Sequence, residues 1–209
     1  MEIMSILAFL GTAVLLTLMP GPDNLFVLAQ SIAQGKKAGI ATTFGLCTGL
    51  LVHITAATLG ISALIYQSAV AFTLIKYAGA CYLLFLAYKS FKAKDSELTV
   101  DGQESQSIDL LSLYRKGILM NILNPKVSLF FLALLPPFVN QSAGHVSLQM
   151  LLLGMVFLAQ ALVIFFAISV FSGKVRVILL KNPRVSRKIN LIQGTLLGII
   201  GLKVAFSGK

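Results

Sequence analysis

Two charged residues lie inside long apolar stretches of this sequence, each beside residues that interrupt a helix. Asp23 follows Pro22 and precedes Asn24, and Lys126 follows Pro125. An uncompensated charge at the centre of a bilayer costs about 3 kcal/mol or more, so such residues usually face an interior pathway and have a partner. The two charges are suited to binding a zwitterion, or Asp23 to carrying a coupling proton. There are two alternatives. Asp23 and Lys126 form a structural ion pair, or these residues and Asn24 cap half-helices.

The residues around these charges predict that two helices are broken within the membrane. Proline removes a backbone donor and clashes with the preceding turn, and glycine loosens the chain. Unwound backbone at membrane depth must line a cavity or be buried in protein. We therefore expect a substrate-binding or coupling site between the two breaks. The candidate residues are Pro20, Gly21, Pro22, Asp23, Asn24, His53, Asn121, Asn124, Pro125 and Lys126.

His53 and Gln160 are polar residues that lie in the middle of other apolar stretches. His53 has a side-chain type that titrates near physiological pH, so it is a candidate proton relay. It is equally well interpreted as a neutral packing residue with one hydrogen bond. A lone amide such as Gln160 more often joins two helices than touches a substrate.

The composition is that of a protein which spans a membrane. The chain has 209 residues, of which 57% are hydrophobic and 11% charged, and its mean hydropathy is +0.89. Soluble domains carry roughly 25% charged residues. The apolar residues also come in runs of about 20, the length of a helix that crosses the hydrocarbon core. We therefore predict an all-α, polytopic protein surrounded by a lipid bilayer.

About six transmembrane helices are expected, and the basic residues orient them. Of 17 Lys and Arg residues, 13 fall in the connections after the first, third and fifth apolar segments. By the positive-inside bias, these connections are cytoplasmic and both termini external. The net charge of +10 is therefore explained by membrane orientation, and nucleic-acid binding is not expected. The apolar segments are 3–33, 39–65, 70–90, 115–139, 146–172 and 189–206.

A hydrophilic stretch at 92–113 divides the chain into two halves, and it holds five of the seven acidic residues. We predict a cytoplasmic linker there, between membrane repeats at 1–91 and 114–209. Three spans per half give the two halves opposite orientations, as in transporters with inverted repeats. Helices 1 and 4, the first of each half, are then the two broken helices.

Motifs of the common enzyme classes are missing from the sequence. It has no His-Glu-x-x-His, no Gly-x-Ser-x-Gly and no phosphate-binding glycine loop, so neither catalysis nor a cofactor is expected. Without an ATP-binding loop, transport has to draw on an ion gradient. The alternative function is export of metal or other small cations, which need several carboxylate, His or Cys ligands. Asp23, His53, Cys47 and Cys81 are a poor supply, and no metal site is predicted.

Glycines recur at short spacings in two of the predicted helices. Small residues at such spacings let helices approach closely, and packing within the chain is favoured over a homodimer contact, which is also possible. The glycines concerned are Gly35, Gly39, Gly45, Gly49, Gly194, Gly198 and Gly201.

Five blocks in order make the sequence similar to the lysine exporter and homoserine/threonine-resistance family, LysE/RhtB. They are 17–22 with Pro-Gly-Pro, 34–49 with its glycines, 76–83, 117–136 with Asn-Pro-Lys, and 194–205. The resemblance covers nearly the whole chain outside the linker. Pro137, Ala78 and Ala87 depart from the family pattern, away from the breaks.

This resemblance implies export of amino acids such as lysine, arginine, threonine, homoserine or leucine, driven by the proton motive force across a bacterial inner membrane. A dibasic substrate would favour further acids in the pathway, and Asp23 is the only acid inside a predicted span. We therefore expect a neutral or hydrophobic amino acid.

Overall fold

The computed structural model describes residues 3–18, 21–67, 69–92, 109–174 and 183–206, and these ranges form helices without any strand. The all-α prediction is confirmed. The α-helices described are α1 (Ile3–Leu18), α2 (Pro22–Gln34), α3 (Lys36–Gln67), α4 (Ala69–Lys92), α5 (Leu110–Ile122), α6 (Pro125–Leu134), α7 (Val146–Val170) and α9 (Pro183–Phe206). Two short 3-10 helices, Pro136–Phe138 and Gln141–Ala143, join α6 to α7.

The first predicted segment is broken, because α1 and α2 meet at a bend of 54°. Gly21 precedes α2 with an extended backbone, and Pro22 opens the helix where its missing N–H is not needed. Asp23 and Asn24 lie in the first turn of α2, and no side chain caps that helix. The N-cap role at the start of α2 considered for these two residues is therefore wrong, because Gly21 holds that position. Pro20 lies outside the described residues.

The fourth predicted segment is also broken, and backbone hydrogen bonds close the turn there. Leu123 N donates to Leu119 O at 2.9 Å, and Asn124 N donates to Asn121 O at 3.0 Å, before α6 begins at Pro125. At its other end α5 starts at Leu110, inside the stretch 92–113 predicted as linker. The reason is local, since the Asp109 carboxylate accepts a capping bond from Ser112 N at 3.0 Å.

The hydrophobic core lies around α3 and α7, which pack against each other. Both helices have the length and hydropathy to cross a membrane, and a third crossing follows if α1 and α2 count as one bent span. This test was met by no other helix in the described part of the chain. The remaining predicted spans correspond to α4, α5 with α6, and α9, so the count of six stays a prediction.

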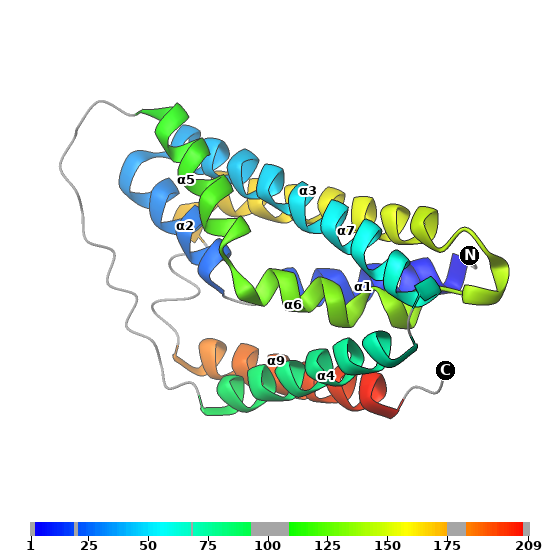
Figure 1. The fold of residues 1–209 in the computed structure, drawn as a ribbon. Helices are drawn as coiled ribbons and strands as arrows, with labels where there is room; N and C mark the ends of the chain where they lie inside the picture. The colour runs from blue at the N-terminus through cyan, green and yellow to red at the C-terminus, as the bar shows by residue number, and fades with distance from the viewer. Residues whose placement is uncertain (1–2, 19–20, 68, 93–108, 175–182, 207–209) are drawn as a thin grey trace.

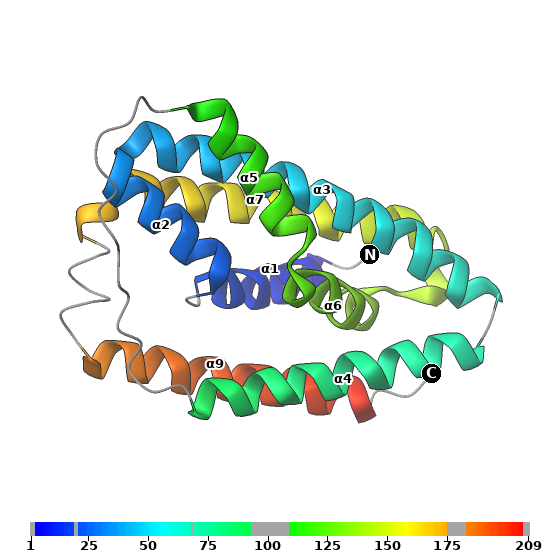
Figure 2. The same ribbon diagram turned by 60° about the vertical axis from the view of Figure 1, so that its left-hand side comes forward.

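Helices α4 and α9 lie side by side along one flank of the molecule in both Figure 1 and Figure 2. Two glycines of α9 face large side chains of α4. A Cβ atom at Gly194 would lie 2.6 Å from the Phe91 ring, and one at Gly201 would lie 3.0 Å from Leu84. The packing role predicted for the glycines of the last helix is confirmed at these two positions.

Helix α5 lies against α3 with backbone touching backbone. A Cβ atom at Gly45 would overlap the Tyr114 carbonyl, and one at Gly117 would lie 2.8 Å from the Thr42 carbonyl oxygen. Gly35 has a different role from the packing one predicted for it. It links α2 to α3 with φ at +86°, a conformation that side chains with a Cβ rarely adopt.

The described helix ends that flank the three basic connections lie at the same end of the molecule. The α2–α3 turn, the end of α4, the start of α5, the end of α7 and the start of α9 gather on the left in Figures 1 and 2. Helix α1 begins and α9 ends at the opposite end. This arrangement is the one expected if the basic residues all face the same side of a bilayer.

Candidate functional site

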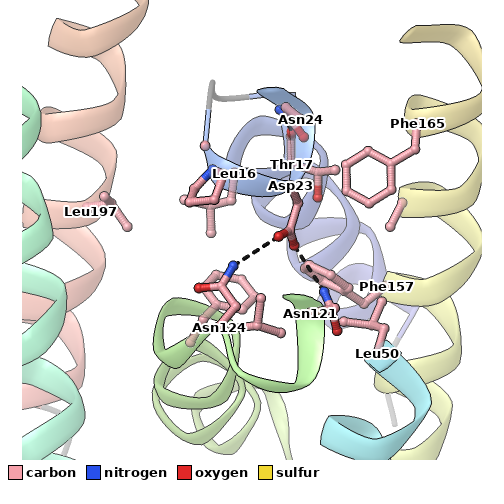
Figure 3. Close-up of a pocket in the computed structure, with 15 residues that line it drawn as sticks. Leu16, Thr17, Asp23, Asn24, Leu50, Asn121, Asn124, Phe157, Phe165 and Leu197 are labelled. Carbon is pink, nitrogen blue, oxygen red and sulfur yellow. Dashed lines mark hydrogen bonds between the residues drawn. The ribbon is translucent and has the colours of Figure 1, made fainter. Parts of the chain in front are cut away.

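A cavity of about 80 Å³ lies between the two breaks. In this measure a single water needs about 10–15 Å³, so the space suits a solute of several heavy atoms. Its lining residues belong to seven helices or to the turns beside them. Figure 3 shows how these residues face one another. The lining residues are Leu16, Thr17, Gly21, Pro22, Asp23, Asn24, Leu50, Asn121, Asn124, Val127, Phe130, Phe157, Ala161, Phe165 and Leu197.

The Asp23 carboxylate joins the two breaks across this cavity. Asn121 Nδ2 donates to Asp23 Oδ2 at 3.0 Å, and Asn124 Nδ2 donates to Asp23 Oδ1 at 3.1 Å. Both bonds are visible in Figure 3, where the two amides approach the carboxylate from the turn between α5 and α6. Each carboxylate oxygen thus accepts a hydrogen bond from a neutral side-chain amide.

The first break is bridged by side chains. Asn24 Nδ2 reaches back to the Thr17 carbonyl oxygen at 2.7 Å, a group left without a helical partner at the end of α1. The Thr17 hydroxyl accepts a bond from Gln160 Nε2 on α7 at 2.8 Å. Gln160 therefore joins two helices, as predicted. Its own Oε1 is buried without a hydrogen-bond partner among the described residues.

His53 lies behind the second break and not among the residues that line the cavity. Its side chain, only 8% exposed, reaches from α3 to both half-helices. Nε2 lies 2.9 Å from Asn121 O, and Nδ1 lies 3.3 Å from Ser128 Oγ. His53 thus contacts the cavity wall through Asn121, whose side chain is bound to Asp23.

The rest of the cavity wall is mostly apolar and includes three phenylalanines. The Phe130 and Phe157 rings lie 5.3 Å apart between centroids, and both line the cavity. Phe165 on α7 and Leu197 on α9 lie on opposite sides of the Asp23 cluster in Figure 3. We did not predict these residues, because a phenylalanine or leucine in an apolar stretch carries no signal that separates it from the core.

The structure brings six of the ten candidate residues together around the cavity: Gly21, Pro22, Asp23, Asn24, Asn121 and Asn124. His53 lies one contact behind them, and Pro20 is outside the described residues. Pro125 and Lys126 form the first turn of α6, directly after Asn124, and their side chains also lie outside what is described. The ion pair between Asp23 and Lys126 therefore stays an open alternative.

Metal-ligating side chains do not cluster in the part of the chain that the structure describes. No group of three or more His, Cys, Asp or Glu residues with suitable positions occurs there. Cys47 and Cys81 are both free thiols, the first buried and the second exposed.

Comparisons with known proteins agree on one family. A family model described as LysE type translocator matches residues 3–208. An uncharacterized membrane protein of Bacillus subtilis, YrhP, is 33% identical, over 97% of this chain and 99% of its own length. A Vibrio cholerae membrane protein is 31% identical over 98% of both chains. A Salmonella typhimurium protein named homoserine/homoserine lactone efflux protein is 29% identical, over 95% and 94%. No solved structure matches the chain.

Proposed function

The chain belongs to the LysE type translocator family, and from that premise we propose that it exports a neutral or hydrophobic amino acid from the cytoplasm. It is a helical multi-pass membrane protein. In our proposal the proton motive force drives export, and the substrate binds in the cavity between the two breaks. Residues of both breaks contribute to binding, and Asp23 is the central one.

The observation that carries this proposal is the Asp23 carboxylate, held between two neutral amides beside an otherwise apolar cavity. In our proposal this carboxylate, whose two oxygens the amides orient, binds the ammonium group of the substrate or a coupling proton. Lys126, at the start of α6, is assigned the substrate carboxylate.

The lining residues support a neutral substrate over a dibasic one. Among the described residues of the cavity wall, Asp23 is the only carboxylate. The second ammonium of a dibasic amino acid would then have to be desolvated against Phe130, Phe157 or Phe165, which is costly without a partner. A short uncharged side chain fits this wall. The name of the Salmonella relative, a homoserine/homoserine lactone efflux protein, supports a substrate of that kind.

We place the protein in the bacterial inner membrane, with the basic connections in the cytoplasm and both termini outside. The gathering of these connections at one end supports this orientation, because cytoplasmic loops are enriched in Lys and Arg.

Export is tested in energised cells that overproduce the protein and are fed dipeptides containing homoserine, threonine, leucine or lysine. Extracellular amino acids are measured for the wild type, Asp23→Asn and Lys126→Ala. We expect faster excretion of a neutral amino acid by the wild type and a decrease of more than tenfold in both variants. Asp109→Asn is the matched control, because it makes the same chemical change at an exposed cap where asparagine serves equally well.

Two results would contradict the proposal. Excretion unchanged in Asp23→Asn would remove the carboxylate from the mechanism. No excess excretion of any amino acid by a membrane-inserted wild type, together with metal sensitivity of a deletion strain, would favour small cations instead. Proton coupling is tested separately, by measuring whether collapse of the proton gradient abolishes export by the wild type.

A further inference from the structure

His53 is the buried polar residue that the proposed transport site does not yet use. It projects from α3, in the first half of the chain, to the break in the second half. Its two ring nitrogens have partners on opposite sides of that break: Asn121 in the last turn of α5 and Ser128 in the first turn of α6. A single rigid ring therefore spans the interruption.

The partners of His53 define which nitrogen carries the proton. A carbonyl oxygen only accepts, so the bond of 2.9 Å to Asn121 O requires a hydrogen on Nε2. In the neutral ring Nδ1 is then an acceptor, and the Ser128 hydroxyl donates to it. Both nitrogens are occupied in this arrangement. A proton relay would require one of them to release its partner, whereas a fixed support uses both.

The support from His53 acts on the residue that binds Asp23. Asn121 is 2% exposed, and its backbone oxygen is held by His53 while its side-chain amide donates to Asp23. Gly49 lies on the same face of α3, four residues before His53. A Cβ atom at Gly49 would lie 2.8 Å from Asn121 Cβ, so Asn121 is in close contact with α3.

The first break has a counterpart to this contact. Gln160 extends from α7, in the second half of the chain, and donates to the Thr17 hydroxyl at the end of α1. Each broken helix is thus contacted by a polar side chain from a central helix of the other half. The repetition of the contact across both halves argues that it serves the breaks themselves and not general packing.

We propose that His53 is a positioning residue, which fixes the α5/α6 break so that Asn121 and Asn124 face Asp23. The inference rests on the proposed function, because it assigns His53 a role in substrate affinity and not in proton transfer. Asn121 and Asn124 leave their positions beside Asp23 when the ring is removed, while the fold of α3 is retained.

The test uses purified protein in proteoliposomes, with homoserine counterflow as the transport assay. His53→Leu removes both hydrogen bonds, and His53→Gln keeps an amide donor at a similar reach but cannot be protonated. We expect His53→Leu to raise KM about tenfold with little change in maximal rate. His53→Gln should restore KM to within about twofold of the wild type.

A second measurement does not depend on any substrate. In a Cys47→Ala, Cys81→Ala background, Ala161→Cys places a thiol in the cavity wall. Alkylation of that thiol by N-ethylmaleimide should be several-fold faster in His53→Leu than in His53→Gln or with His53 intact, because the break is no longer held. If His53→Leu does not accumulate in the membrane, His53→Asn, which is too short to reach Asn121, takes its place in both assays.

The outcomes separate the two proposals. Unchanged KM and unchanged alkylation in His53→Leu would overturn the role of His53. Equal loss of transport in His53→Gln and His53→Leu, with normal alkylation in both, would overturn positioning in favour of a relay. If the wild type moves no homoserine while the alkylation contrast is seen, the proposed substrate class fails and the positioning role stands.

Discussion

The two breaks interrupt two different predicted spans, and the backbone at each break is held in a different way. In the first, Gly21 is extended and the Asn24 and Gln160 side chains reach the end of α1 at Thr17. In the second, the backbone closes its own turn through Leu123 and Asn124, and α5 contacts the α3 backbone. The first break contributes the charge of Asp23, and the second contributes the amides that surround it.

This difference suggests a division of roles. A turn closed by backbone bonds, backed by another backbone and also held by His53 has few ways to move, so it presents Asn121 and Asn124 as fixed donors. A break held by side chains changes shape with the loss of one or two hydrogen bonds. We expect the first break to be the more adaptable of the two, and the following substitutions test that expectation.

The largest effect is expected where α5 touches α3. In Gly45→Ala the added methyl overlaps the Tyr114 carbonyl, and helix backbones have to separate, so we expect a loss of about 3 kcal/mol of stability. Gly11→Ala in α1 is the matched control, because nothing lies within 4 Å of the position that its methyl group would take. Alanine there should be neutral or stabilise by about 1 kcal/mol. Thermal unfolding in detergent, followed by circular dichroism, measures both; equal melting temperatures would contradict the rigid contact.

Removal of the Thr17 hydroxyl should have the next largest effect. Thr17→Val leaves Gln160 Nε2 without its acceptor, beside an Oε1 that already lacks a partner among the described residues, at a cost of about 2 kcal/mol. Thr17→Ser keeps the hydroxyl and should stay within about 0.5 kcal/mol of the wild type. Similar unfolding of the two variants would show that Gln160 does not support the first break.

A smaller difference in stability is expected between Asn24→Ala and Asn124→Ala. Loss of Asn24 leaves the Thr17 carbonyl without its donor and should cost about 1 kcal/mol. Asn124→Ala retains the backbone bond from Asn124 N to Asn121 O, so the second break should keep its shape and lose less stability. Export should nevertheless fall in Asn124→Ala, since Asp23 loses a donor. Unfolding and export are measured for both variants. Greater destabilisation by Asn124→Ala than by Asn24→Ala would show that the second break is the more adaptable one.

The smallest effect is expected for Ser128→Ala. It removes the longer of the two His53 contacts, at 3.3 Å, and leaves the bond to Asn121 O in place. We expect a loss of about 0.5 kcal/mol and an increase in KM of about twofold. A change in KM as large as that of His53→Leu would mean that the α6 side of the contact is the dominant one.

Much of the fold could be predicted because its signals are local. Proline and glycine restrict or free the backbone at their own positions, so both breaks were located before any contact was known. Helix ends were harder to predict. The Asp109 cap extends α5 into the predicted linker, and Gly35, expected to pack between helices, forms a turn instead.

The sequence by itself determined that Asp23, Asn121 and Asn124 lie at interruptions within apolar helices, because charge, hydropathy and chain breaks are properties of short stretches. Only the tertiary structure decided that the Asp23 carboxylate binds both asparagine amides, across 98 and 101 residues. The same holds for His53 and Gln160, whose partners lie in the opposite half of the chain. A hydrogen bond needs its atoms within about 3.5 Å, and the order of residues does not specify which helices pack closely enough to meet that condition.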